Sequence, residues 1–298
     1  MKSLFYKIIY ASNVNFILRN ILKIFNYIFG FKFILHPSGI VKTILKNNKV
    51  VYFKTNQTAY VTVRIFWHGY KSFEYSLIFI DLIKKIKTFF DVGANIGYYT
   101  ILGGSINKNL KIISFEPSDG ACQYVKNNII LNNLSKNVIL EKSALSDNNG
   151  YTEFHEVYNP KYPLTPNLSG EHNIGTKTLK SMKISNVKTI TLDNYISKEK
   201  ITSLDLIKLD TEGSEHLIIK KGIKTIKKFK PIIICEILRK SKNNVFINDL
   251  LKKLNYNFYY HNNNKLIKIN SLNEKLIHNP KDYFFVHPCK EILIKEYL

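Results

Sequence analysis

The chain has 298 residues, of which 45% are hydrophobic and 13% aromatic, so it can build a sizeable core and is not disordered throughout. Its formal net charge of +22 comes almost wholly from lysine, because Arg19, Arg64 and Arg239 are the only arginines. Proteins that read nucleic acids favour arginine, so we expect no specific nucleic-acid partner and assign most lysines to solvated faces. The alternative is a basic surface for anionic membranes or acidic substrates.

The first 48 residues are predicted to be mainly helical. Residues 14–35 form an apolar stretch that Arg19, Lys23 and Lys32 interrupt, which argues against a membrane span. No signal peptide is predicted either, and we expect a cytoplasmic protein. An amphipathic basic helix is indicated by apolar residues at helical spacing: Ile17, Ile21, Ile24, Phe25 and Ile28. We expect this apolar face to pack on the body of the protein; the alternative is peripheral contact with the inner face of an anionic membrane.

The rest of the chain alternates between strand and helix patterns. Residues 49–66 predict a strand pair around a polar turn at Asn56 and Gln57, and residues 73–86 predict a helix. Buried strands are then predicted at residues 88–93, 111–117, 137–145, 204–210 and 230–237. Helices are predicted at residues 96–106, 118–133, 213–229 and 243–254. Short apolar strands that alternate with helices indicate a doubly wound α/β fold with a mostly parallel sheet.

Two departures from this alternation define the predicted domain organisation. About 58 residues separate the third and fourth strands, and we interpret them as two extra strands around a long loop, an insertion at about residues 146–190. The last strand-like runs, NFYYHN and YFFVHP, predict a terminal antiparallel pairing. We therefore divide the chain into an N-terminal helix and strand-pair extension (residues 1–70) and a Rossmann-like domain (residues 71–298).

The turn after the first buried strand, FDVGANIGYYT, is the first motif with chemical content. Gly93 and Gly97 let the backbone approach a ligand where the chain enters a helix. The turn lacks both the GxGxxG fingerprint and a Walker lysine, which disfavours pyrophosphate and triphosphate cradles. Glu116 ends the second strand, 25 residues after Asp91, where a carboxylate can accept both hydroxyls of a ribose. An adenosine-containing ligand is indicated, and these features alone fit NAD as well as S-adenosylmethionine.

An ordered series of motifs makes a resemblance specific. In chain order they are FDVGANIGYYT, ISFEPSDGACQYVKNNIILNN, VILEKSALSD, TLDNYI, LDLIKLDTEGSEHLIIKKG and KPIIICEI. The series resembles the FkbM family of S-adenosylmethionine-dependent methyltransferases and covers roughly residues 74–237. The resemblance implies a class I methyltransferase sheet with an antiparallel seventh strand at its edge, and S-adenosylmethionine as the cofactor.

The resemblance also implies cofactor-binding roles for residues of this chain. By it, Glu116 takes the ribose hydroxyls, Ser143 and Ala144 flank the adenine, and Glu74 matches an acidic position before the first strand. The methionine end of the cofactor would be lined by residues of the first turn: Asp91, Gly93, Asn95 and Gly97. The structural alternatives are that Asp91 caps the following helix and that Gly97 serves helix packing.

The sequence LDTEGSEH at the end of the fourth strand supplies the predicted catalytic group. A hydroxyl acceptor must lose its proton, which calls for a general base or a metal ion. We predict that Asp210, Glu212 and His216 carry this role, with His155 and His172 of the insertion as further candidates. The carboxylates could also bind a divalent cation, but their spacing assigns no metal site. The alternative for Asp210 is a helix cap, and for His216 a partly buried surface position.

These observations predict an S-adenosylmethionine-dependent methyltransferase. No DPPY-like or NPPY-like sequence follows the fourth strand, which argues against methylation of exocyclic amino groups of bases. We predict O-methylation of a hydroxyl group on a small molecule, and the resemblance to the FkbM family implies a sugar or glycan precursor as that molecule. The alternatives are a nucleotide-dependent oxidoreductase and a non-catalytic basic protein that binds membranes or nucleic acids.

Overall fold

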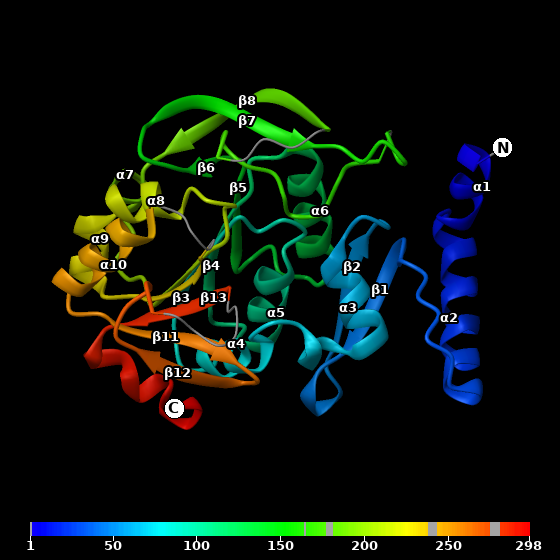
Figure 1. Cartoon of the computed structure of the whole chain (residues 1–298), viewed down its shortest axis with the longest axis horizontal. Helices are drawn as coiled ribbons and strands as arrows, with labels where there is room; N and C mark the ends of the chain where they lie inside the picture. The colour runs from blue at the N-terminus through cyan, green and yellow to red at the C-terminus, as the bar shows by residue number, and fades with distance from the viewer. Residues whose placement is uncertain (1, 164, 177–180, 238–242, 275–280) are drawn as a thin grey trace.

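Short apolar runs form the parallel part of a central sheet in the computed structural model (Figure 1). The structure describes residues 2–163, 165–176, 181–237, 243–274 and 281–298. In the described part, the sheet has the strand order β12-β11-β13-β10-β9-β3-β4-β5. Its parallel strands are β3 (Thr88–Val92), β4 (Lys111–Phe115), β5 (Val138–Glu141), β9 (Leu206–Leu209) and β10 (Ile232–Glu236). The predicted doubly wound α/β class is confirmed.

Helices cover both faces of this sheet because successive side chains of each strand point to opposite sides. Phe89 packs into one core and its neighbour Phe90 into the other. The first core lies under α3 (Tyr60–His68), α4 (Ser76–Ile83), α5 (Tyr98–Ile106) and α6 (Asp119–Leu131). The second lies under α7 (Leu192–Lys198), α8 (Glu215–Lys220), α9 (Ile223–Phe229) and α10 (Asn243–Lys253). The single helix predicted at residues 213–229 is thus two helices that meet at Gly222.

The last strand of the chain, β13 (Asp282–Val286), is antiparallel to both of its neighbours. It lies between β10 and β11 (Asn257–Asn262), so the predicted antiparallel pairing is confirmed. The predicted edge position is wrong, because a hairpin of β11 with β12 (Lys265–Ile269) extends the sheet further. The chain ends in two short 3-10 helices at Pro288–Leu293 and Lys295–Tyr297.

The insertion forms a separate small sheet with the order β6-β8-β7 above the carboxyl ends of the central strands (Figure 1). It consists of β6 (Ala144–Leu145), β7 (Gly150–Val157) and β8 (Met182–Ile190), with β7 and β8 antiparallel. The two predicted extra strands are present. The third predicted strand, residues 137–145, is split between β5 and β6, because the chain leaves the central sheet after Glu141. Within the insertion, residues 164 and 177–180 lie outside the described residues.

A hairpin of β1 (Gly39–Ile44) and β2 (Val50–Thr55) precedes the central domain, with a 3-10 turn at Lys46–Asn48. The predicted pair at residues 49–66 is wrong in its second half, because α3 occupies residues 60–68 and the partner of β2 comes earlier in the chain. The β-branched run of α3 is helical because it packs on the shared core. Asn128 of α6 and Asn132, which directly follows α6, hold β2: the side chain of Asn128 accepts from and donates to the backbone of Lys54, and that of Asn132 does the same with Tyr52.

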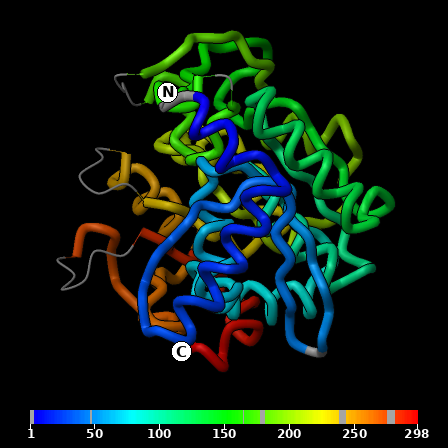
Figure 2. The backbone as a smooth tube through the Cα atoms, turned by 90° about the vertical axis from the view of Figure 1, so that its right-hand side faces the viewer, coloured from blue at the N-terminus to red at the C-terminus, as the bar shows by residue number. Residues whose placement is uncertain are grey.

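Two N-terminal helices, α1 (Lys2–Ile9) and α2 (Ser12–Phe29), lie along one edge of the molecule against β1 (Figure 1; Figure 2). The expectation that their apolar face packs on the body is wrong. Ile17, Ile21, Ile24 and Ile28 are exposed, whereas Asn15 and Arg19 are buried. Within the described residues, no helix combines the length and apolar character needed to cross a membrane.

Candidate active site

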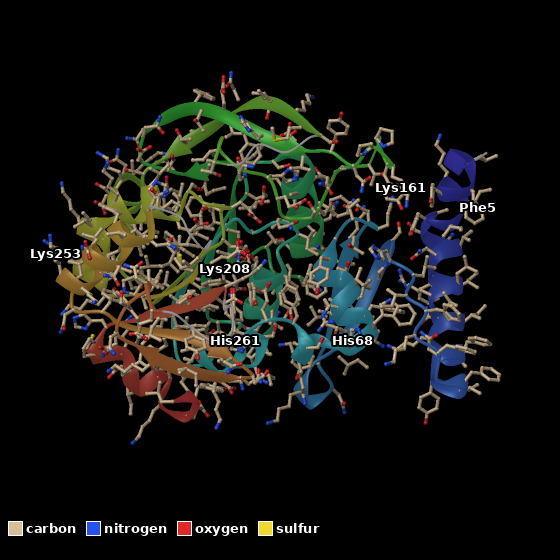
Figure 3. The ribbon with its side chains drawn as sticks, viewed as in Figure 1. Phe5, His68, Lys161, Lys208, Lys253 and His261 are labelled. Carbon is tan, nitrogen blue, oxygen red and sulfur yellow. The ribbon has the colours of Figure 1, made fainter. Side chains whose placement is uncertain are left out.

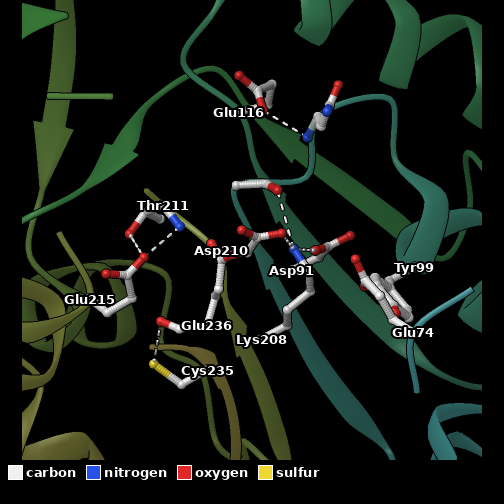
Figure 4. A network of polar contacts seen from close by, with 12 residues as sticks. Glu74, Asp91, Tyr99, Glu116, Lys208, Asp210, Thr211, Glu215, Cys235 and Glu236 are labelled. Carbon is white, nitrogen blue, oxygen red and sulfur yellow. Dashed lines mark hydrogen bonds and ion pairs between the residues drawn. The ribbon is translucent and has the colours of Figure 1, made fainter. Parts of the chain in front are cut away.

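A cavity opens at the carboxyl ends of β3, β4 and β9, where an open α/β sheet of this kind holds its ligands. Six of the sequence-predicted site residues line it: Gly93, Asn95, Glu116, Ser143, Ala144 and Asp210. The insertion contributes Phe154 of β7 and the segment at residues 170–174 to its walls. Side chains from distant parts of the chain therefore meet at one site (Figure 4).

The turn after β3 shapes the floor of this cavity. Gly93 has φ +74°, and a Cβ atom there would lie 1.9 Å from the carbonyl oxygen of Asp210, so only glycine fits. The backbone N–H groups of Gly93 and Ala94 both donate to the carbonyl of Phe115 at 3.0 Å. Asn95 also has a positive φ, 53°, and its buried Oδ1 has no hydrogen-bond partner in the described part of the chain. An acceptor oxygen is thus available beside the cavity.

Glu116 connects the first two strand ends. Its Oε2 accepts from the backbone N–H of Asn95 at 2.8 Å, and its Oε1 accepts from that of Ser118 at 3.0 Å. Burial raises the pKa of Glu116 to about 7, while these two backbone hydrogen bonds act in the opposite direction. Each carboxylate oxygen keeps lone pairs free, so this side chain can still accept hydrogen bonds from a ligand.

Lys208 is a buried cation beneath the site (Figure 3; Figure 4). Its Nζ lies 3.1 Å from Oδ2 of Asp210 and 3.6 Å from Oδ1 of Asp91, and it donates to the carbonyl of Gly93 at 3.3 Å. Burial alone would lower the pKa of Lys208, but Asp210 and Asp91 outweigh it and keep this pKa well above its usual value. Lys208 therefore fixes the Asp210 carboxylate at the edge of the cavity.

More carboxyl groups surround Asp210 than this one cation can balance. Burial and the charges of Asp282 and Asp210 raise the pKa of Glu74 to about 8, although Tyr99 donates to its Oε2 at 2.8 Å. Burial and Asp210 raise the pKa of Asp282 to about 7. Burial, Asp210 and Glu212 raise the pKa of Glu236 to about 9. We call these carboxyl groups, together with Glu212, the acidic rim. Those with raised pKa values keep their protons at a higher pH than exposed carboxyl groups do.

Five sequence-predicted residues do not line the cavity. Oδ2 of Asp91 accepts from the backbone N–H and the hydroxyl of Thr100 in the first turn of α5, as in the capping alternative. A Cβ at Gly97 would lie 3.1 Å from Val125, which fits the packing alternative. His216 lies on α8 beside a separate small pocket, and burial lowers its pKa. Glu212 and Glu74 lie at the acidic rim.

Three of these carboxylates are close enough to share a ligand. Asp210, Glu212 and Glu236 each offer an oxygen within 4.8 Å of the others. Carboxylate oxygens suit hard divalent cations, but exposed acidic groups are common without one, and we assign no metal to them.

The two histidines of the insertion have different positions. His172 lines the cavity, but both of its ring nitrogens are engaged: Nδ1 accepts from the N–H of Val157 at 2.9 Å, and Nε2 contacts the carbonyl of Asn167 at 2.7 Å. Accepting at Nδ1 places the proton on Nε2, so His172 serves the loop rather than a substrate. His155 does not line the cavity; it pairs through its backbone with Asn173.

A cover segment, residues 168–176, lies across the cavity. Asn95 Nδ2 donates to the carbonyl of Leu168 at 3.2 Å, and Thr176 Oγ1 donates to the carbonyl of Glu212 at 2.6 Å. Beneath the cover segment the cavity measures about 70 Å³, far less than the several hundred Å³ of a typical cofactor pocket. The cover segment therefore forms one wall of the cavity.

Sequence reasoning missed several residues of this site. Lys208 is the single charged residue within the apolar run of β9, and such an interruption is a signal for a buried ion pair. Glu236 is the last residue of β10 and Asp210 directly follows β9, so both carboxylates lie at the carboxyl ends of neighbouring strands. Glu215 accepts from the N–H groups of Thr211 and Gly213 at 2.8 and 3.2 Å and so holds the loop after β9.

The model of the methyltransferase FkbM domain matches residues 91–258, more than half of the chain. The fold and site therefore define a methyltransferase-like α/β protein. The chain belongs to the FkbM methyltransferase domain family, an S-adenosylmethionine-dependent methyltransferase family, and the resemblance seen in the sequence is confirmed.

Similar solved structures include the methyltransferase FkbM from Methylobacillus flagellatus KT, with 16% identity and a TM-score of 0.44 over 76% of this chain and 47% of that one. This chain thus spans about half the length of that protein. A precorrin-6y C5,15-methyltransferase from Geobacter metallireducens GS-15 has 10% identity and a TM-score of 0.39 over 71% and 86% of the two chains. The N-terminal domain of human METTL16 in complex with SAH has 14% identity and a TM-score of 0.40 over 72% and 68%. No curated protein matches the chain significantly.

Proposed function

We propose that this protein is an O-methyltransferase that uses S-adenosylmethionine to methylate a hydroxyl group of a sugar or glycan precursor. The observation that carries the proposal is the position of Asp210. It lines the cofactor cavity, is held by Lys208 at 3.1 Å, and keeps 40% of its side chain exposed. A carboxylate held in this way can accept the proton that a hydroxyl acceptor must lose.

Five residues of the cavity would hold the cofactor. Glu116 would accept the ribose hydroxyls, Gly93 and Asn95 would face the methionine end, and Ser143 and Ala144 would flank the adenine. The unpartnered Oδ1 of Asn95 supports the fit, because a buried acceptor without a donor is costly. When bound, the cofactor supplies a methyl group on a sulfonium that leaves readily.

The groups around Asp210 support a sugar as the acceptor class. The rim offers carboxyl groups, which match the closely spaced hydroxyls of a sugar. The loop after β9 has the sequence Asp210, Thr211, Glu212, Gly213. It is not a DPPY-like or NPPY-like sequence, which argues against an exocyclic amino group of a base as the acceptor. His216 is left out of this role because it lies beside a different pocket.

Calorimetric titration with S-adenosylmethionine, S-adenosylhomocysteine and NAD tests the cofactor. We expect both sulfur ligands to bind and NAD not to bind. Glu116→Gln should weaken both by about tenfold or more, because charged hydrogen bonds are worth about 1.5–3 kcal/mol. Glu199→Gln, an exposed carboxylate at the end of α7, is the control and should bind as the wild type does. Binding of NAD alone would instead support the oxidoreductase alternative.

Release of S-adenosylhomocysteine in the presence of free sugars, nucleotide sugars, phenols and amines tests the acceptor. We expect turnover with a sugar. Asp210→Asn should lower kcat by about 100-fold or more, with cofactor affinity changed less than about threefold. Asp249→Asn, an exposed position on α10, is the matched control. Turnover with an amine only would refute O-methylation, and an unchanged kcat in Asp210→Asn would refute the base while leaving the reaction class intact.

A further inference from the structure

The two N-terminal helices turn an apolar surface away from the protein. On α2, Ile17, Ile21, Ile24 and Ile28 recur at helical spacing and are 56%, 57%, 61% and 63% exposed. Leu4 and Ile8 of α1 are 64% and 53% exposed. We call these six residues the outer face. Figure 2 looks onto these helices, and no other described element lies in front of them.

Aromatic side chains continue the outer face at the end of α2. Phe25 stacks on Phe31 with ring centroids 5.3 Å apart, and Phe33 lies 5.4 Å from Phe31. Phe31 and Phe33 are 49% and 53% exposed, and Tyr27 is 91% exposed. Phe5 of α1 is also exposed (Figure 3). Exposed apolar surface of this extent marks an interaction site in a soluble protein.

Buried polar contacts fix this orientation. Arg19 of α2 is 1% exposed, and it donates to the carbonyls of Ser38 and Ile40 and to Oδ1 of Asn15. Asn15 also accepts from the N–H of Ser38 at 2.7 Å. Rotating α2 so that its isoleucines face β1 would break these hydrogen bonds and leave buried groups unpaired. The outer face is therefore held outward by the fold.

Charge identifies the partner. The first 73 residues contain nine lysines and two arginines, and the first acidic residue of the chain is Glu74. Lys7 and Lys32 are exposed beside the outer face, and Lys23 donates to the carbonyl of Phe66 at its inner border. An apolar helix face with a basic border and aromatic residues is the pattern of a helix that lies in the interface of an anionic bilayer.

We propose that the outer face of α1 and α2 docks on an anionic lipid bilayer, with the isoleucines in the acyl boundary and the lysines at the headgroups. Pairing with a second copy of the chain is disfavoured, since face-to-face contact would bring two basic regions without a carboxylate together. The proposal is independent of the reaction that the protein catalyses, because it uses none of the cavity residues.

Co-sedimentation of the full chain with vesicles of phosphatidylcholine alone, or of phosphatidylcholine with phosphatidylglycerol, tests the proposal. We expect binding to the anionic vesicles that is at least about tenfold stronger than to the neutral ones and that weakens with added salt. The double variant Ile21→Glu/Ile24→Glu should lose at least about tenfold in affinity. The control is Ile184→Glu/Ile292→Glu, two isoleucines that are 58% and 70% exposed elsewhere, and it should bind like the wild type.

Far-ultraviolet circular dichroism and S-adenosylhomocysteine binding establish that both double variants are folded. Equal vesicle binding by the wild type and by the outer-face variant would overturn the proposal, as would equal binding to neutral and anionic vesicles. A wild-type dimer in sedimentation velocity that Ile21→Glu/Ile24→Glu converts to a monomer, without vesicle binding, would also overturn it and would assign the outer face to a second copy.

Discussion

The central sheet and the N-terminal helices distribute polar and apolar residues in opposite ways. The strands bury phenylalanine and isoleucine on both faces and present charged groups at their carboxyl ends. Helix α2 buries Asn15 and Arg19 and exposes four isoleucines. Both regions nevertheless satisfy the same requirement, since most of the buried polar groups in each have hydrogen-bond partners.

This difference shows what decides the orientation of an amphipathic element. In the sheet, both faces pack against helices that present apolar residues, so the burial of apolar side chains determines which residues face inward. At α2, the neighbouring backbone of Ser38 and Ile40 presents carbonyl groups, so the hydrogen bonds that Arg19 donates to them determine which side of the helix faces inward. An apolar stripe alone therefore predicts a helix but does not predict which side of it faces the protein.

The largest effect is expected at the closest backbone approach of the central site. Gly93→Ala places a Cβ 1.9 Å from the carbonyl oxygen of Asp210, and we expect a loss of about 3 kcal/mol or more in the free energy of unfolding, with loss of S-adenosylhomocysteine binding. Gly30→Ala after α2 has a similar φ, +70°, in the left-handed region, but open space around it, and should cost about 1 kcal/mol. Urea unfolding compares the two, and equal losses would show that the conformation rather than the contact is responsible.

An intermediate effect is expected where α2 meets β1. Arg19→Met removes donors to the carbonyls of Ser38 and Ile40, and we expect a loss of about 2 kcal/mol in the free energy of unfolding. The control, Arg64→Met, removes one contact of 3.3 Å to Ser72 and should cost less than about 1 kcal/mol. Urea unfolding measures both. A loss in Arg19→Met no greater than in the control would contradict the argument that this arginine sets the orientation of α2.

The smallest effect is a pH dependence at the acidic rim. Burial, Asp210 and Glu212 raise the pKa of Glu236 to about 9, far above the usual range of a carboxyl group. A raised carboxyl pKa contributes stability that is present below about pH 4.5 and is lost as the pH rises through about 9. The variant Glu236→Gln cannot ionise, so its free energy of unfolding should fall less between pH 5 and pH 9 than that of the wild type, by roughly 1 kcal/mol.

Urea unfolding at several pH values gives this slope, with the exposed Glu199→Gln as the control. Parallel curves for Glu236→Gln and the wild type would mean that the rim does not hold protons in the folded protein. The same experiment on Arg19→Met should show no change in slope, since α2 carries no carboxylate.

The fold class was predictable because the signal is local. Short, mainly apolar strands of four to five residues that alternate with helical patterns indicate buried parallel strands, and Glu116 and Gly93 follow from their positions at strand ends. The strand pair near residue 50 was misplaced because β-branched residues of α3 are typical of strands but pack here as a helix.

By itself, the sequence determined the alternation of strands and helices, the family and the residues at the ends of β3, β4 and β9, because these depend on neighbours along the chain. The tertiary structure decided which predicted residues share a cavity, that Lys208 balances Asp91 and Asp210, and that α2 faces outward with its isoleucines. Those outcomes depend on charges and hydrogen-bond partners that lie far apart in sequence, and only folding brings them within reach of one another.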